Sequence, residues 1–198
     1  NYFDGVVNDT KCWYVPLGTN EKLKPKGLQE TKGKIKLGFI GRLYHDKVKG
    51  EDKLLELASK LDPKKFEFVI LSPNAEALTK NLRERFKVYT ANDGGFEKAF
   101  NSIDITLVLS KYEGTPLPLI ESLQIGIYVL STKVGEAPSL LDNENLLSSV
   151  DQFYERLNYI YDNRKCLQQF KNKGPKLTKD RTWKSFVEKS IKIWESIL

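Results

Sequence analysis

The chain has few of the residues that build metal and redox sites. Its 198 residues include no methionine, one histidine (His45) and two cysteines, Cys12 and Cys166. The cysteines lie far apart without the spacing of metal ligands, so reduced thiols are expected. A lone histidine in a polar loop supplies neither a zinc site nor a catalytic triad, and no nucleophilic serine elbow is present. Any site must therefore rely on carboxylates, cations and backbone groups.

Long apolar runs are also absent. No stretch approaches the length that spans a bilayer, and no signal-peptide pattern occurs. Hydrophobic residues make up 40% and charged residues 29% of the chain, which is an ordinary balance for a globular protein. A cytoplasmic location is expected. The chain does not begin with Met, so we expect it to be a piece of something longer.

The net charge is +6, with lysines concentrated near the amino end and again from Lys171 to Lys192. A basic chain favours nucleic acid, anionic lipid or a phosphate-bearing ligand as partner. Nucleic acid is not expected, because no stacking aromatic side chains interleave with the lysines. The lysines alternate with polar residues, which is typical of a solvated surface. Peripheral contact with the inner face of a membrane stays open.

Strand and helix patterns alternate from Lys34 onwards. Strands are expected at 35–40, 66–71, 87–89, 105–109 and 127–130, with Leu146–Leu147 as a short sixth candidate. Helices are expected at 51–61, 75–86, 96–103, 116–125, from 150, and at about 183–198, where the last is strongly amphipathic. This alternation predicts the α/β class, with a Rossmann-like, doubly wound parallel sheet.

The run from Glu113 to Glu121 is the most informative segment. It follows an apolar strand, and a strand that ends in a glycine turn and opens a helix builds a phosphate site. Proline is tolerated only in the first turn of a helix, so Thr115 is expected as the N-cap and Pro116 as the first helical residue. With the helix dipole, a diphosphate cradle would form from the backbone amides of Gly114, Thr115, Leu117 and Leu119.

The two acids of this run occupy different depths. Glu113 lies in the loop at the carboxyl end of a strand, where open α/β sheets bind ligands. Glu121 lies in the helix, about 7.5 Å further along the axis than Pro116. This separation suits two contacts along an extended ligand such as a sugar nucleotide. The alternative is a pair of acids that only complements the helix dipole.

Two further loops follow strands at the same expected edge. Arg42, in Gly41-Arg42-Leu43, could grip a phosphate with two donors, and Lys49 or Lys47 could add a point charge. The glycines there lack the third member of a dinucleotide fingerprint, so NAD is weakly supported. After the fifth strand, Gly135 permits close backbone approach, and Glu136 either accepts sugar hydroxyls or is solvated.

Taken in order, these motifs resemble the carboxyl-terminal, donor-binding domain of a retaining GT-B glycosyltransferase of the family 4 type (glycosyl transferases group 1). The run Glu113 to Glu121 is similar to the family's E-x7-E motif. Gly41-Arg42-Leu43 with Lys49-Gly50 resembles "G-R-L…K-G". Three weaker matches are Val15 to Asn20 ("V-P-N-G-V-D"), Val134 to Pro138 ("V-G-G-x-P") and Trp183 ("F-S-W").

The resemblance implies transfer of a sugar from a nucleotide diphosphate sugar to an acceptor glycan, lipid or protein, without a metal or other cofactor. Arg42 and Lys49 would hold the diphosphate, and Glu113 would contact hydroxyls of the transferred sugar. Glu121 would hold the ribose hydroxyls, with the base near 72–74 and 88–89. The substrate-binding set is then Gly41, Lys47, Gly114, Thr115, Pro116, Leu117, Glu121, Ser72, Asn74, Val88, Tyr89 and Gly135, beside Glu113, Arg42 and Lys49 as the catalytic set.

The same resemblance divides the chain into three parts. Residues 1–33 would be an interdomain segment and linker, 34–175 the nucleotide-sugar-binding domain, and 176–198 a helix that packs on an amino-terminal, acceptor-binding domain that is not in this sequence. Such a fragment would bind donor but transfer sugar poorly. Two alternatives stay open: a sugar-nucleotide epimerase of the same architecture, and a non-catalytic interaction domain that uses the basic surface and the tryptophan helix. The base, sugar, acceptor and oligomeric state are left undetermined.

Overall fold

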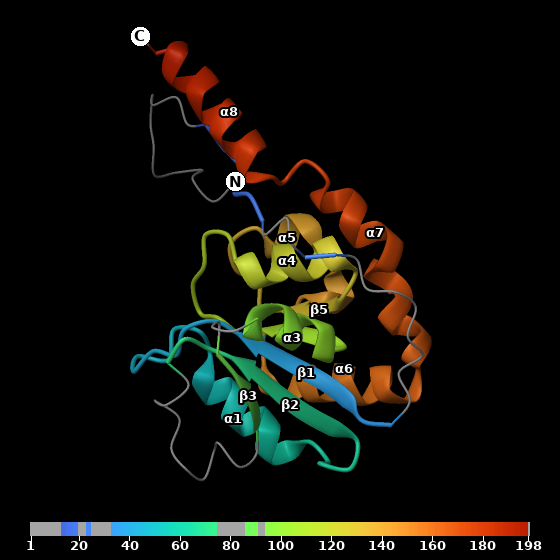
Figure 1. Cartoon of the computed structure of the whole chain (residues 1–198). Helices are drawn as coiled ribbons and strands as arrows, with labels where there is room; N and C mark the ends of the chain where they lie inside the picture. The colour runs from blue at the N-terminus through green and yellow to red at the C-terminus, as the bar shows by residue number, and fades with distance from the viewer. Residues whose placement is uncertain (1–12, 20–22, 25–32, 75–85, 91–93, 198) are drawn as a thin grey trace.

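A computed structural model describes residues 13–19, 23–24, 33–74, 86–90 and 94–197 (Figure 1). Its centre is a five-stranded sheet in the order β3-β2-β1-β4-β5, with every neighbouring pair parallel. The strands are β1 (Ile35–Ile40), β2 (Phe66–Leu71), β3 (Phe86–Tyr89), β4 (Ile105–Val108) and β5 (Tyr128–Ser131). The expected parallel sheet is confirmed, and each strand begins and ends within one residue of its prediction.

The helices that connect the strands follow the predicted alternation, and two further helices, at 137–140 and 169–178, were not predicted. They are α1 (Glu51–Lys60), α3 (Gly95–Ser102), α4 (Leu117–Ile125), α5 (Ala137–Leu140), α6 (Val150–Asp162), α7 (Gln169–Thr178) and α8 (Trp183–Glu195). Residues 75–85 of the helix expected at 75–86 lie outside the described residues, and Phe86 is the first residue of β3. The expected sixth strand is wrong, because Leu146 makes only a single bridge to Ser131.

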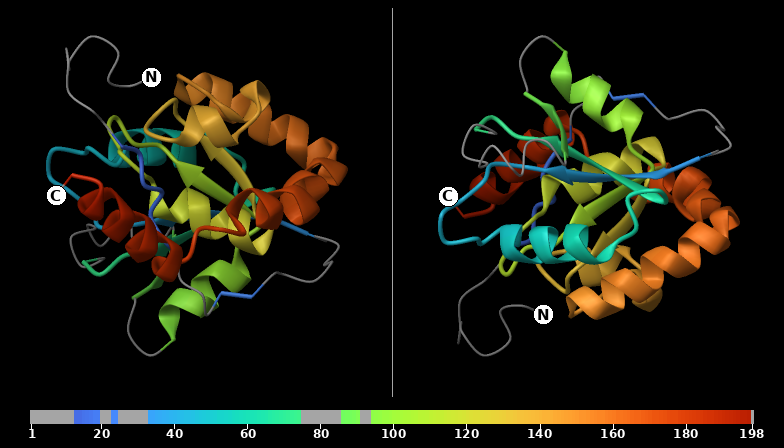
Figure 2. Two further views of the ribbon diagram at one scale, coloured as in Figure 1. Left: turned by 90° about the horizontal axis from the view of Figure 1, so that it is seen from above. Right: turned by 90° about the horizontal axis from the view of Figure 1, so that it is seen from below.

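Helices cover both faces of the sheet (Figure 2). On β2, Phe66, Phe68 and Ile70 join the larger core, which also contains the buried residues of α1 and α6. The alternate residues Val69 and Leu71 join a second cluster with α3. This division follows from the strand period of two, which points successive side chains to opposite faces. In β4 all four residues are buried, as in a strand that is covered on both faces.

The start of α6 shows how far local sequence rules hold. Ser149 caps the helix as predicted, since its Oγ accepts a hydrogen bond from the Gln152 backbone N–H at 3.2 Å. The return bond differs, because the Gln152 side chain accepts from the backbone N–H of Ser148 at 2.7 Å. The expected apolar face is confirmed, with Phe153, Leu157 and Ile160 all buried.

Helix α4 lies against both the sheet and α7, and α7 approaches it closely. A Cβ added at Gly174 of α7 would lie 2.3 Å from the backbone oxygen of Leu123 in α4. Only glycine permits that contact without a shift. The domain boundary expected after residue 175 falls inside α7. The division into three parts stays a prediction.

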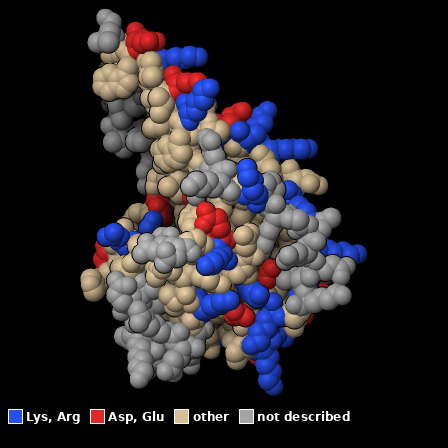
Figure 3. Space-filling model, viewed as in Figure 1, with Lys and Arg blue, Asp and Glu red and all other residues tan. Residues whose placement is uncertain are grey.

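Helix α8 extends away from the sheet and the other described helices (Figure 1). None of its residues is buried, and Trp183, Val187, Ile191 and Trp194 are exposed, Trp194 to 68%. On the face drawn in Figure 3, Lys and Arg side chains over α7 and α8 are interspersed with acidic and uncharged residues. Within the described ranges, no helix combines the length and the apolar character that crossing a membrane requires.

Candidate functional site

The point where the strand order reverses lies between β1 and β4. The chain runs from β1 outward to β2 and β3, then returns to place β4 on the other side of β1. Their following loops are joined, since the backbone N–H of Lys111 donates to the Val48 carbonyl at 2.8 Å. A Cβ at Gly50 would lie 2.2 Å from the carbonyl oxygen of Leu109, so the two loops touch through backbone. Open α/β sheets bind ligands at such a reversal.

Glu113 is held in place at this reversal. Its Oε1 accepts a hydrogen bond from Lys49 Nζ at 2.5 Å and from Ser110 Oγ at 2.8 Å. The Glu113 side chain is 12% exposed and that of Lys49 is 27% exposed, so solvent screens this pair only partly. A small cleft runs beside them between the carboxyl ends of β1 and β4, lined by Ile40, Ser110, Pro116 and Pro118 among others. Two residues from separate loops thus meet as the sequence predicted.

The choice between the two lysines depends on the backbone of their loop. Lys47 adopts a positive φ of 57° and is exposed, with its backbone N–H donating to the Tyr44 carbonyl at 3.1 Å. Lys49 lies two residues on and reaches Glu113. The geometry therefore favours Lys49 as the cation of the site.

Ser110 was not among the residues predicted for the site. Besides its bond to Glu113, its carbonyl accepts from Thr132 Oγ1 at 2.7 Å, which joins the loop after β5 to the loop after β4. Ser110 could have been suspected because it directly follows a strand. Serine is common at such positions, however, and no neighbouring residue indicates that it contacts Glu113.

Arg42 follows β1 and is exposed. Among the residues that the structure describes, none pairs with its guanidinium. The next residue, Leu43, is fixed by Asn74, whose side chain accepts from the Leu43 N–H at 3.0 Å and donates to its carbonyl at 2.9 Å. Ser72 Oγ donates to the same Asn74 oxygen at 2.9 Å. Ser72 and Asn74 thus brace the Arg42 loop, while direct contact between them and a base stays a prediction.

The other two residues expected near a base lie at the end of β3. Val88 and Tyr89 are half-buried, and the Tyr89 carbonyl accepts from the Ser72 N–H at 3.1 Å. Lys87 Nζ lies 5.3 Å from the centre of the Tyr89 ring. Hydrogen bonding from Lys87 lowers the pKa of Tyr89. These residues lie at the carboxyl edge of the sheet, beside the turn that contains Asn74, and their contact with a base stays a prediction.

The start of α4 differs from the prediction in two ways. Thr115 is not the N-cap: Pro116 occupies that position without a side-chain cap, and the helix begins at Leu117. The Thr115 hydroxyl instead donates to Glu136 Oε1 at 2.8 Å, because this buried carboxylate competes for it. Leu119 is also unavailable to a ligand, since its N–H donates to the Pro116 carbonyl at 2.9 Å.

Three amides of the expected cradle remain. Within the described part of the chain, no group accepts a hydrogen bond from the N–H of Gly114, Thr115 or Leu117. Gly114 has open space around its Cα, since an added Cβ would meet no atom within 4 Å. Free N–H groups at the start of a helix are a ready site for an anion.

Glu121 lies in the second turn of α4 and is buried to 8% exposure. Its helix neighbours Leu119, Ile120 and Leu123 are fully buried. Burial raises the pKa of Glu121 to about 7, because desolvation penalises the charged carboxylate. A strongly shifted carboxyl beside an open helix terminus is typical of a functional site.

The turn after β5 holds the Glu113 loop from the other side. Gly135 has a φ of 50°, and a Cβ there would lie 2.0 Å from the Gly114 carbonyl oxygen. The close approach predicted for Gly135 is thus to backbone of the neighbouring loop. Glu136 is neither solvated nor open to a ligand, contrary to both expectations, because its Oε2 forms an ion pair with Arg181 Nη1 at 2.6 Å.

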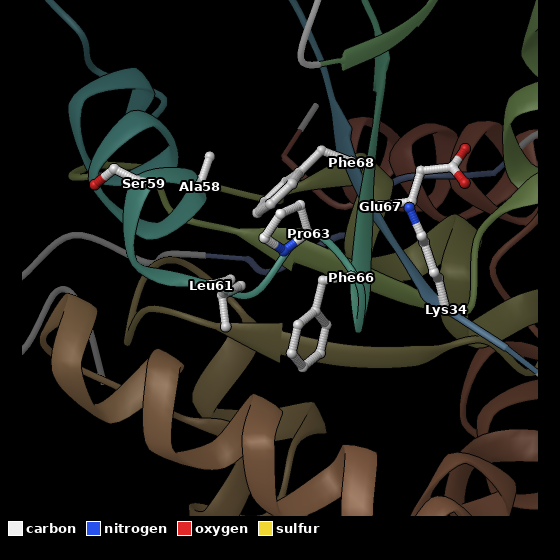
Figure 4. A pocket seen from close by; sticks show the side chains of 8 residues that line it. All are labelled: Lys34, Ala58, Ser59, Leu61, Pro63, Phe66, Glu67 and Phe68. Atoms are coloured by element: carbon white, nitrogen blue, oxygen red, sulfur yellow. The ribbon is translucent and has the colours of Figure 1, made fainter.

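A larger cavity of about 420 Å³ lies elsewhere, at the amino-terminal edge of the sheet (Figure 4). Ala58, Leu61, Pro63, Phe66 and Phe68 form most of its lining. It lies at the opposite edge of the sheet from the loops that follow β1 and β4, and Lys34 and Glu67 are the charged residues of its lining. Size alone does not make it the better candidate, because a phosphate-bearing ligand needs polar partners.

Metal chemistry has no evident ligand set in the described ranges, where no group of three His, Cys, Asp or Glu side chains converges. The polar groups that do converge are Lys49, Glu113, Ser110 and the free amides that precede α4, with Arg42 exposed on the neighbouring loop.

Comparison with known proteins identifies this arrangement. The family model "Glycosyl transferases group 1" matches residues 20–177, which is most of the chain. The chain belongs to this family. No curated protein sequence shows a significant match.

Solved structures show the same fold at low sequence identity. Sucrose-phosphate synthase from Thermosynechococcus elongatus matches with a TM-score of 0.79 and 16% identity, over 99% of this chain and 55% of that chain. HepE from Anabaena, solved with UDP-glucose, matches with a TM-score of 0.69 and 13% identity, over 82% of this chain and 49% of that chain. The fold is thus that of one Rossmann-like half of a GT-B glycosyltransferase, and the chain spans about half the length of these two proteins.

A third structure has nearly the same extent as this chain. The carboxyl-terminal domain of the group 1 glycosyl transferase LpcC from Francisella tularensis matches with a TM-score of 0.59 and 20% identity, over 82% of this chain and 94% of that domain. A family member has therefore been studied as an isolated domain of this kind.

Proposed function

We propose that this chain is the donor-binding half of a retaining glycosyltransferase of the family 4 type, which moves a sugar from a nucleotide diphosphate sugar to an acceptor. The observation that carries the proposal is the fixed carboxylate of Glu113, held by Lys49 beside the free amides at the start of α4. Family membership and the UDP-glucose bound to HepE support a nucleotide sugar as the ligand. The base and the sugar are left to experiment.

The donor would lie across the carboxyl ends of β1 and β4. Its diphosphate would take hydrogen bonds from Lys49, the exposed Arg42 and the backbone of Gly114, Thr115 and Leu117. When the sugar leaves, these donors would stabilise the charge that develops on the diphosphate, which is the main catalytic contribution that this half can make. Gly41 and Pro116 would line the path, with Lys47 outside the first contacts.

The two carboxyl groups would bind opposite ends of the ligand. Glu113 would exchange its contact with Lys49 for hydroxyls of the transferred sugar, while Lys49 turns to phosphate. Glu121 would accept hydrogen bonds from the ribose hydroxyls, and binding would favour its ionised form. The base would lie beyond Gly41, near Asn74, Val88 and Tyr89.

The acceptor would bind to a second domain packed against α8. The acceptor is a glycan, lipid or protein, and the reaction would take place in the cytoplasm, with peripheral contact at the inner face of a membrane as a further option. Because both halves are needed to bring acceptor and donor together, this chain alone should bind donor and transfer sugar poorly.

Calorimetry with UDP, GDP and ADP tests the proposal. We expect one of the three to bind, and Glu121→Ala to weaken that binding about tenfold, since hydrogen bonds to a charged group are among the stronger ones. Glu113→Ala should leave the nucleoside diphosphate affinity nearly unchanged and remove any preference for the sugar-bearing form. Glu188→Ala, on the exposed side of α8, is the control.

Lack of binding by all three at millimolar concentration would contradict the proposal and favour an interaction domain. Release of an epimerised sugar nucleotide in the absence of acceptor would favour the epimerase. Equal affinities of wild type and both carboxylate variants would remove the assigned roles even if a nucleotide binds.

A further inference from the structure

Arg181 lies in the short connection between α7 and α8, far along the chain from every residue of the candidate site. Its guanidinium Nη1 lies 2.6 Å from Glu136 Oε2. The two side chains are only 11% and 9% exposed, so this ion pair is largely removed from water. Loss of one partner would leave an uncompensated buried charge, which is strongly unfavourable.

Glu136 also contacts the loop that contains Glu113. Its second carboxylate oxygen accepts from Thr115 Oγ1 at 2.8 Å, and its backbone N–H donates to the Gly114 carbonyl at 3.1 Å. Gly114 and Thr115 supply two of the three open amides at the start of α4. The direction of those amides therefore depends on where Glu136 lies.

The backbone of Arg181 is fixed by the amino-terminal segment. Its carbonyl accepts from both the N–H and the Oγ1 of Thr19, each at 3.0 Å. Gly18 lies against the start of α8, since a Cβ there would be 2.4 Å from the Trp183 nitrogen. Arg181 Nη2 also donates to the Tyr14 hydroxyl at 3.3 Å. Segment 13–19, Arg181 and the first turn of α8 are thus joined by direct contacts.

We infer that Arg181 is a positioning residue for the open amides of Gly114 and Thr115, acting through Glu136, and that it couples them to the junction of segment 13–19 with α8. The identity of the ligand that those amides bind rests on the proposed function. A rotation of α8 or a displacement of segment 13–19 would shift Arg181. The ion pair with Glu136 would then displace the loop that contains Gly114 and Thr115. Coupling of this kind needs a contiguous set of close contacts, which these residues supply.

Hydrogen–deuterium exchange on the 198-residue chain tests the coupling without any ligand. Arg181→Gln should raise exchange at the N–H of Glu136, which donates to the Gly114 carbonyl, and at the N–H of Leu119, which donates to the Pro116 carbonyl, and should leave β2 protected. Arg181→Lys, which keeps the charge, should restore part of the protection. The control is Lys173→Gln on α7, which removes an exposed ion pair between Lys173 and Asp142. Wild-type exchange at Glu136 and Leu119 in Arg181→Gln overturns the inference, as does equal loss of protection at β2, since that reports general destabilisation.

Affinity for a nucleoside diphosphate is the second measurement. With whichever of UDP, GDP or ADP the wild type binds, Arg181→Gln and Glu136→Gln should each weaken binding about tenfold, and the double variant should be little worse than either. Unchanged affinity despite increased exchange overturns the positioning role. If the wild type binds none of the three, the proposed function fails, while the exchange result still decides whether Arg181 holds the loop.

Discussion

Helices α4 and α8 use apolar residues in opposite ways. Six of the nine residues of α4 are buried, including Glu121, and its apolar residues lie on all sides. Helix α8 has a distinct apolar stripe formed by Trp183, Val187, Ile191 and Trp194, yet none of its residues is buried. The first helix lies between the sheet and α7, whereas the second has no such cover among the described residues.

The difference shows that the apolar pattern of a helix indicates which residues can be buried. Whether they are buried depends on the elements that pack against the helix. A helix that is apolar all round belongs inside a core, and an amphipathic one belongs at a boundary. The candidate site depends on α4, whose surroundings are complete within this chain. The stripe of α8 suits a second surface, as expected for a helix that packs on another domain, and this packing stays a prediction.

The largest difference in stability is expected when the same substitution is made in each helix. Ile120 of α4 is fully buried and Ile191 of α8 is 50% exposed. Ile120→Ala should lower the free energy of unfolding by about 2–5 kcal/mol, because it removes apolar contacts and leaves a cavity. Ile191→Ala should change it by less than about 0.5 kcal/mol. Urea unfolding of both variants checks this, and similar losses would show that α8 is packed in solution.

The next effect concerns the charge inside α4. Because burial raises the pKa of Glu121 from 4.5 to about 7, the folded chain binds a proton more readily than the unfolded chain between these pH values. This group's contribution to stability is therefore most favourable below the unfolded pKa and declines as pH rises to about 7, by up to about 3 kcal/mol. Glu121→Gln should remove that decline.

Urea unfolding at several values between pH 5 and pH 8 measures the effect as the difference between wild type and Glu121→Gln. Other titrating groups cancel in this difference. Glu188→Gln, an exposed acid on α8, should keep the wild-type slope. A Glu121→Gln profile parallel to wild type would show that the carboxyl is hydrated in solution.

The smallest effect compares two helix caps. Ser149 caps α6, which packs against α1, and Thr182 caps α8 by accepting from the Ser185 N–H at 3.0 Å. Ser149→Ala should lower global stability by about 1 kcal/mol. Thr182→Ala should reduce the helical circular dichroism signal without moving the urea midpoint, because α8 adds little to the packed core. A shifted midpoint for Thr182→Ala would show that α8 contributes to the stability of the packed core.

Most of the fold was predictable because its signals are local. The largely apolar strands, the prolines near the start of α4 and the Ser149 cap can each be recognised from a few neighbouring residues. The edge of the sheet that carries the site followed from the alternation of strand and helix. Glu113 and Lys49 could be placed on that edge before any coordinates were known.

The predictions that were wrong concern residues whose contacts join distant segments of the chain. Thr115 has the right position for an N-cap, but Glu136 takes its hydroxyl, and Glu136 is itself fixed by Arg181. No local pattern joins these three residues. The choice of Lys49 over Lys47 rests on a positive φ at Lys47, which lysine rarely adopts and which sequence rules do not anticipate.

The contact of Gly135 with the Gly114 carbonyl bears on how such a site diversifies. Since even a methyl group at position 135 would lie 2.0 Å from that oxygen, the turn after β5 restricts the path of the neighbouring loop. Side chains at the rim can be exchanged one at a time, but the backbone of the two loops must change together. A loop after β4 taken from another family member would therefore fit this sheet only if its own β5 turn were transplanted with it.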